Sequence, residues 1–143
     1  MADFYTGRQL IIDRLRASGA WTATPAGRLV FMGDATFDPG ASPAPFCVVE
    51  IIGGESTPYV GRPSNRLHRD DGLIVMHFME PVGSGFESIA AMHRNARDLL
   101  AAQSFSGVTV MGLSAGGGRP SSEDGNYHGA TATAPFFYLY LTS

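Results

Sequence analysis

Hydrophobic residues recur along the chain at two different periods, and the longer period indicates two helices. Near the N-terminus, apolar positions at helical spacing predict a helix over about residues 3–18, with Phe4, Ile11, Ile12 and Leu15 on its buried face. Asp3 and Thr6 are alternative caps for its start. Gly19 fits the residue after its end.

The second predicted helix begins at Ser84 and ends near Gln103. Ser84 and Glu87 have the spacing of a capping box, in which each side chain bonds to the other residue's backbone amide. The residues behind it form an apolar stripe with a polar face opposite, and the stripe consists of Ile89, Met92, Ala96, Leu99 and Leu100.

Short apolar runs between turn residues predict five strands, at about residues 29–32, 46–52, 72–79, 108–113 and 130–141. The run at 46–52 is apolar on both faces except for Glu50, so we expect it to be central or covered. Pro135 cannot donate to a ladder, which predicts an edge position or a bulge. Trp21 is expected to pack under the end of the first helix.

The predicted order of elements is α-β-β-β-α-β-β. It indicates one α+β domain over residues 1–143, with two helices packed on a mainly antiparallel sheet. Two connections are long. Residues 53–71 are predicted to be an arm joining the second and third strands, because they far exceed an ordinary hairpin loop. Residues 114–126 are predicted to be a flexible glycine-rich loop.

Composition narrows the classes of function. All ten basic residues are arginine, against thirteen acidic residues and a net charge of −3. The absence of lysine excludes Walker-type phosphate loops, Schiff-base chemistry and kinase phosphoryl transfer. The negative charge disfavours a general nucleic-acid binder.

Cys47, the single cysteine, lies in an apolar run and is expected to act as a small buried hydrophobe. No run is long enough to span a membrane, so we expect a soluble intracellular protein.

Two patterns resemble catalytic or metal sites. Gly112-Leu113-Ser114-Ala115-Gly116 matches the nucleophile elbow of serine hydrolases, with Glu123 or Asp124 and then His128 following. An elbow runs directly into a helix, and the glycines and proline after Ser114 oppose one. Residues His68, Asp70, Asp71 and His77 are metal-ligand types, but their spacing fits no named site. We therefore predict no catalytic residue, no metal and no cofactor.

The arm carries residue types that are enriched at protein interfaces. Its candidate contact residues, for a neighbouring subunit or another partner, are Tyr59, Arg62, Arg66, His68 and Arg69. Pro58 and Pro63 stiffen it. A solvated surface loop is the alternative interpretation of the same segment.

The pattern as a whole resembles the tail terminator (tail completion) proteins of long-tailed phages and gene transfer agents. The resemblance rests on element order and loop placement, with matching pieces at residues 5–17, 29–32, 46–52 (Phe-Cys-Val-Val-Glu-Ile-Ile), 73–78 (Leu-Ile-Val-Met-His-Phe), 84–101, 108–110 and 127–140. It covers nearly the full chain.

The resemblance implies a homo-oligomeric ring, sixfold in that family, that caps the tail tube, fixes its length and offers a docking surface for the head. It implies three partners: other copies of the chain, the tail tube protein and a head-completion or neck protein. DNA would pass through the ring without specific binding, which suits the modest negative charge. A head-completion protein of the same kind of particle and a small hydrolase using Ser114 are the alternatives.

Overall fold

The computed structural model describes residues 3–17, 28–32, 45–62, 65–81, 86–114, 117–119 and 127–142. Within them it has two helices and seven strands: α1 (Phe4–Ala17), β1 (Arg28–Phe31), β2 (Phe46–Arg62), β3 (Asn65–Pro81), α3 (Glu87–Leu100), β4 (Ser104–Phe105), β5 (Val108–Val110), β6 (Gly117–Arg119) and β7 (Tyr127–Thr142).

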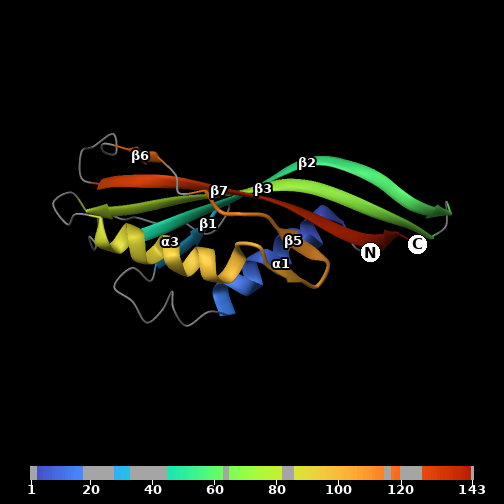
Figure 1. The fold of residues 1–143 in the computed structure, drawn as a ribbon, viewed down its shortest axis with the longest axis horizontal. Helices are drawn as coiled ribbons and strands as arrows, with labels where there is room; N and C mark the ends of the chain where they lie inside the picture. The colour runs from blue at the N-terminus through green and yellow to red at the C-terminus, as the bar shows by residue number, and fades with distance from the viewer. Residues whose placement is uncertain are drawn as a thin grey trace.

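The strands form one sheet in the order β1-β2-β3-β7-β5-β4, with β6 also paired to β7. Only the β1–β2 pair is parallel among these strands. Figure 1 shows both helices on the same face of the sheet. The predicted α+β class, with two helices on a mainly antiparallel sheet, is confirmed. The short strands β4 and β6 add to the predicted order.

The core lies between the helices and this face of the sheet. Alternate residues of the three long strands point into it, because side chains alternate between the faces of a strand. The largest fully buried apolar side chains are Phe78, Ile11, Leu15, Ile74, Met76, Met92, Leu100, Val49, Val108 and Val110. Cys47 is fully buried among them, and its burial raises the pKa of the thiol. It acts as the small hydrophobe that the sequence predicts.

The two helix starts differ from each other. Asp3 caps α1, because its Oδ1 accepts a hydrogen bond from the Thr6 backbone N–H at 3.1 Å. The Thr6 hydroxyl in turn accepts from the Asp3 backbone N–H, so Asp3 is the cap, and Thr6 is its partner within the first turn rather than the alternative cap. The predicted start of α3 at Ser84 is wrong. That helix begins at Glu87 after Phe86, whose side chain makes no capping bond, and Ser84 lies outside the described residues.

The arm is a ribbon of paired strands, whereas the sequence predicted a loop between two shorter strands. The β2–β3 ladder runs from Phe46↔Met79 to Arg62↔Asn65, with register shifts between Gly53 and Ser56 and between Pro58 and Val60. The third strand of the ribbon is β7, which pairs with β3 over the whole of that strand's length from Pro81 to Arg66. Figure 1 shows the three strands continuing past α1 at one end of the molecule.

Pro135 lies inside β7 at a break in the ladder. On one side of β7, pairing with β5 ends at Phe136 and pairing with β6 begins at Thr131, so Pro135 lies between the two paired stretches. Its carbonyl accepts a hydrogen bond from the Met111 N–H, just after β5 ends. The N–H and C=O of one residue point to the same side of a strand, so the N–H that proline lacks would have faced this break.

Residues 117–119, predicted to be flexible, form β6. Trp21 lies outside the described residues.

Candidate assembly interface

The five predicted contact residues of the arm do not converge on one surface. Arg66 and His68 face the side of the sheet that carries the helices, since they alternate in phase with buried Asp70. Arg69 faces the opposite side. Tyr59 and Arg62 belong to β2, but their side chains lie outside the described part of the chain. The ribbon therefore divides the predicted site between its two faces.

Arg69 is held by its own chain. Its Nε donates to Asp71 Oδ1 at 3.0 Å, and its guanidinium carbon lies 4.1 Å from the centroid of the Phe137 ring. Both side chains of the ion pair are partly exposed, where such pairs contribute little to stability. The aromatic contact adds the attraction between a cation and a ring face. Arg69 thus stiffens the β3–β7 part of the arm.

His68 belongs to a polar cluster at the base of the arm. Its ring stacks on Tyr140 with centroids 5.6 Å apart and an interplanar angle of 18°. Burial raises the pKa of Tyr140, and its hydrogen bond to Asp70 raises that pKa further, against an opposing contribution from Ser56. Burial and the charges of Asp3 and Asp70 also raise the pKa of Tyr138. The cluster keeps both phenols neutral next to a carboxylate.

The arm also has an apolar patch at its tip, on the face that lacks helices. Val60, Leu67 and Leu141 sit directly across from one another on β2, β3 and β7. Val60 and Leu141 are each 63% exposed. We call these three residues the tip patch. The sequence alone did not predict it, because only the strand register brings Val60 and Leu67 beside Leu141.

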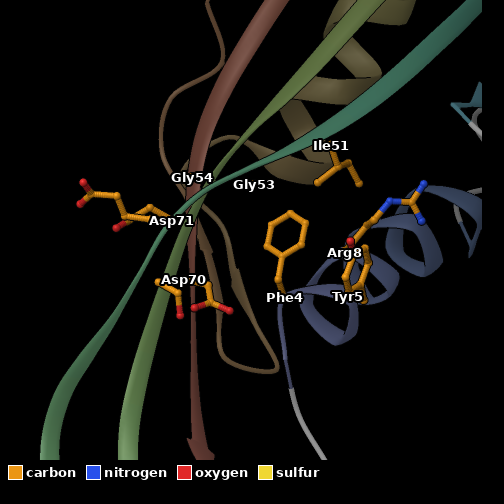
Figure 2. Close-up of a pocket in the computed structure, with 10 residues that line it drawn as sticks. Phe4, Tyr5, Arg8, Ile51, Gly53, Gly54, Asp70 and Asp71 are labelled. Atoms are coloured by element: carbon orange, nitrogen blue, oxygen red, sulfur yellow. The ribbon is translucent and has the colours of Figure 1, made fainter.

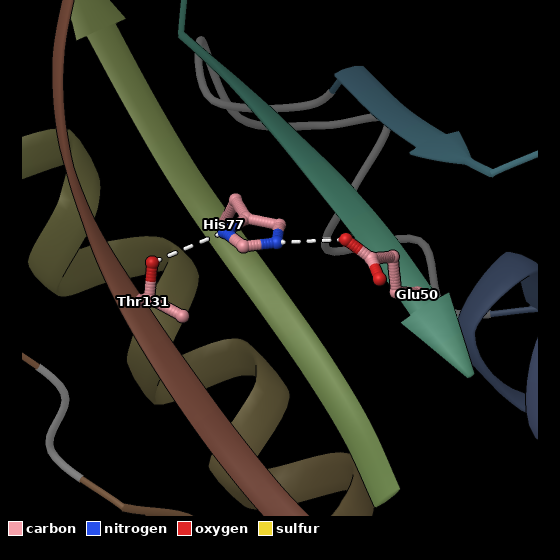
Figure 3. Close-up of polar contacts among 3 residues, drawn as sticks. All are labelled: Glu50, His77 and Thr131. Carbon is pink, nitrogen blue, oxygen red and sulfur yellow. Dashed lines mark hydrogen bonds and ion pairs between the residues drawn. The ribbon is translucent and has the colours of Figure 1, made fainter. Parts of the chain in front are cut away.

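The same face of the sheet carries one more exposed apolar residue and, nearer the middle, a polar network. Ile52 is 46% exposed beside Leu73. Further along, His77 makes two hydrogen bonds: Nδ1 lies 3.1 Å from Thr131 Oγ1, and Nε2 lies 3.2 Å from Glu50 Oε1 (Figure 3). His77 lies on the face away from the helices, with both ring nitrogens in polar contacts.

A cleft of about 400 Å³ lies at the base of the arm, between the start of α1 and the first register shift of β2. Figure 2 shows Phe4, Tyr5 and Arg8 on its helix side and Asp70 and Asp71 on its strand side. A side chain at Gly53 would have its Cβ 3.3 Å from the Phe4 ring, so this glycine lets α1 approach the strand. The cleft was not predicted, because α1 and β2 are distant in sequence.

The candidate metal ligands are separated by the sheet. His68 and Asp70 lie on one face of β3, and Asp71 and His77 lie on the other. No group of three or more His, Cys, Asp or Glu side chains in the described ranges has the proximity needed to hold a metal ion.

Ser114 is not arranged as a nucleophile. Its Oγ accepts a hydrogen bond from the Thr133 backbone N–H at 2.9 Å. The imidazole next to it, His93, bonds through Nε2 to the Ser114 carbonyl rather than to Oγ. The predicted base His128 instead lies 3.0 Å from Glu80. A serine nucleophile needs a base on its own hydroxyl, and neither imidazole takes that place.

Comparisons with known proteins give the fold and no function. No family model matches the chain, and no curated protein matches it. Seventeen chains of solved structure are similar to it. One of them has a TM-score of 0.62 at 13% identity, over 93% of this chain and 94% of that one. At this low sequence identity, the similarity supports the architecture alone.

No helix in the described ranges has the length and apolar character required to cross a bilayer.

Proposed function

We propose that the chain is a non-enzymatic assembly protein, a tail terminator whose copies form a ring, hexameric as in the family it resembles. The ring caps the growing tail tube, fixes its length and presents a surface to the head-completion or neck protein. Its subunits are made in the bacterial cytoplasm and stay at the head-proximal end of the tail in the finished particle. DNA passes through the ring without specific binding.

The observation that carries this proposal is the exposed tip patch on an arm with no helix beneath it. A ribbon that buries neither face gains little by folding alone, because burial of apolar surface is the main stabilising contribution. Val60 and Leu141 place large apolar side chains in water at its end. Contiguous exposed apolar residues mark interaction sites, and a second protein surface would remove them from water.

The arm is also protected against unspecific strand addition. Beyond Val49, where pairing with β1 stops, the outer edge of β2 has no strand partner among the described residues. Pro58 and the two register shifts interrupt that edge. Edge strands are commonly blunted in this way against open-ended aggregation. An arm with an apolar face and a blunted edge suits a defined contact, as a closed ring requires.

The role of the arm is tested with a double variant, Val60→Ser with Leu141→Ser. Purified protein is mixed with tail tube protein, and tube lengths are measured by negative-stain electron microscopy. Wild-type protein is expected to give capped tubes of uniform length. The double variant, with an unchanged circular dichroism spectrum, is expected to give overlong tubes. Met111→Ser is the matched control, because Met111 is 44% exposed but lies outside the arm.

Two outcomes contradict the proposal. Wild-type protein that remains monomeric and leaves tube length unlimited excludes a tail terminator. Particles that lack the protein, with tails of normal length but heads that fail to join them, would assign the protein to head completion instead. A Ser114→Ala variant is expected to assemble normally, since the Ser114 hydroxyl has only a structural contact with Thr133.

A further inference from the structure

The cleft at the base of the arm contains a buried acidic group that its own chain does not fully satisfy. Asp70 is only 3% exposed and lines the cleft. Tyr140 bonds to its carboxylate, yet Oδ1 has no hydrogen-bond partner in the described part of the chain. A buried carboxylate oxygen without a donor is costly, more so than a neutral polar atom. Oδ1 is covered by its neighbours, so a donor that enters the cleft bonds to it once a neighbouring side chain moves, and this bond would remove the cost.

The charge of the cleft favours a cation as that donor. Its charged lining consists of Glu55, Asp70, Asp71 and Arg8. Asp71 is already paired with Arg69, and Arg8 donates through Nη2 to the Met32 carbonyl at 3.1 Å. Glu55 and Asp70 therefore remain as acidic groups available to an incoming side chain.

The other wall of the cleft favours a guanidinium over an ammonium group. Phe4 and Tyr5 contribute aromatic rings, packed edge to face with centroids 5.6 Å apart, and Tyr5 is 72% exposed. A guanidinium is planar and weakly hydrated, stacks on aromatic rings and can bond to both oxygens of a carboxylate. Arginine is the only basic residue besides histidine in this chain, so another copy of it offers this chemistry.

Most arginines with a described side chain are held within the chain. Their contacts are Arg8 with Met32, Arg14 with Leu99 and the Phe105 ring, Arg16 with the Phe31 ring, and Arg69 with Asp71. Arg66 has a partner as well. Arg97 lies 3.7 Å from Asp98. Arg94 is exposed on the outer face of α3 and has no hydrogen bond or ion pair with any residue that the structure describes.

We propose that the Asp70 cleft of one subunit binds the Arg94 side chain of a second copy. The cleft and the outer face of α3 are different surfaces, and Figure 1 shows α3 displaced along the long axis from the start of α1. Contacts between two different surfaces are head-to-tail, and they close into rings when the rotation between subunits permits. The inference rests on the proposed ring and identifies one of its subunit contacts.

Sedimentation velocity over a range of concentrations tests the contact. Arg94→Ala and Asp70→Asn are each expected to raise the dissociation constant between subunits about 30-fold, as for other desolvated charge pairs at interfaces. The double variant is expected to be no weaker than the worse single one, because both changes remove the same contact. Arg97→Ala, one helical turn further on the same face, is the matched control and is expected to change the constant less than threefold.

Cross-linking tests the same contact without altering Asp70, whose replacement could affect folding. Glu55→Cys protein is mixed with Asp98→Cys protein and oxidised, while buried Cys47 stays unreactive. A disulfide-linked heterodimer is expected from this mixture. Exposed Met32→Cys replaces Glu55→Cys in the control, which is expected to give no heterodimer.

The outcomes separate the two proposals. If wild-type protein assembles, but Arg94→Ala and Asp70→Asn assemble equally well and no heterodimer forms, the Arg94 contact is wrong and the ring stands. If wild-type protein is monomeric at every concentration, both the ring and the contact are wrong.

Discussion

Oε1 of Glu80 lies 3.0 Å from Nε2 of His128, directly across the β3–β7 ladder. The Glu80 side chain is fully buried, and its Oε2 has no hydrogen-bond partner in the described residues. The His128 ring also packs against the Phe86 ring at the start of α3, with centroids 5.0 Å apart. This pair joins β3, β7 and α3 at the end of the sheet away from the arm.

Replacing His128 with alanine is expected to lower the free energy of unfolding by about 3 kcal/mol, because Glu80 would keep a buried carboxylate without its donor. Urea denaturation followed by circular dichroism measures the loss. His93→Ala is the control, since it removes a bond to the Ser114 carbonyl at an exposed site, and is expected to cost about 1 kcal/mol. Equal losses in the two variants would contradict a special role for the Glu80 pair.

The buried thiol of Cys47 is expected to make the free energy of unfolding fall as the pH rises above 9. Burial raises its pKa above the ordinary value of 9.0, so above pH 9 the unfolded chain loses this proton while the folded chain retains it. The unfolded state then binds fewer protons, and stability falls as the pH rises. Stability is expected to fall by about 1 kcal/mol between pH 9 and 10, and the slope approaches about 1.4 kcal/mol per pH unit at higher pH.

Urea denaturation at several pH values measures this slope in wild-type protein and in Cys47→Ala. The variant is expected to be less stable at neutral pH because of the lost packing. The fall in its free energy of unfolding that the thiol causes above pH 9 should be absent. Thiol-reactive reagents are expected to label wild-type protein only after unfolding. Rapid labelling of the folded protein at pH 8 would show that Cys47 is not buried as described.

Sequence patterns predicted the elements that pack on the core. The stripe of α3, for example, is buried at Ile89, Met92, Ala96 and Leu100, as its helical spacing predicts. Such patterns arise because one face of the element is removed from water. The same reasoning located β2, β3 and β7 where the helices cover them.

The arm was misread for the opposite physical reason. Where no helix lies against the sheet, neither face of a strand requires apolar residues, so residues 53–71 lack the alternation that marks a strand. The β2 half of the arm pairs with β3 across the hairpin, but its β3 half also pairs with β7, whose partner residues are about 70 positions further along, as in Arg69↔Leu139. The tip patch and the Asp70 cleft depend on the same long-range register, and local patterns contain no signal for either.

Removing the cap of α1 is expected to have a modest effect on stability. Asp3→Ala is expected to lower the free energy of unfolding by about 1 kcal/mol, because the Thr6 amide loses its acceptor and the helix N-terminus loses a favourable charge. Thermal or urea denaturation measures it. Asp13→Ala, which removes an exposed bond from Gln9 within the same helix, is expected to cost about 0.3 kcal/mol. A larger loss for Asp13 than for Asp3 would contradict the assigned cap.

Replacing Gly7 with alanine is expected to lower stability, which is opposite to the usual effect at a helical glycine. Replacing an exposed helical glycine with alanine normally stabilises a helix by about 1 kcal/mol. Gly7 is buried, however, and an added Cβ would lie 2.8 Å from the Tyr138 ring carbons. Gly7→Ala must therefore displace α1 or the Tyr138 side chain, which is expected to destabilise the fold by about 2 kcal/mol.

Gly112→Ala is the control, since its Cβ would meet no atom within 4 Å, and it is expected to change stability by less than about 0.5 kcal/mol. Urea denaturation of both variants decides the matter: a stabilised Gly7→Ala protein would mean that α1 does not pack against Tyr138 at this distance.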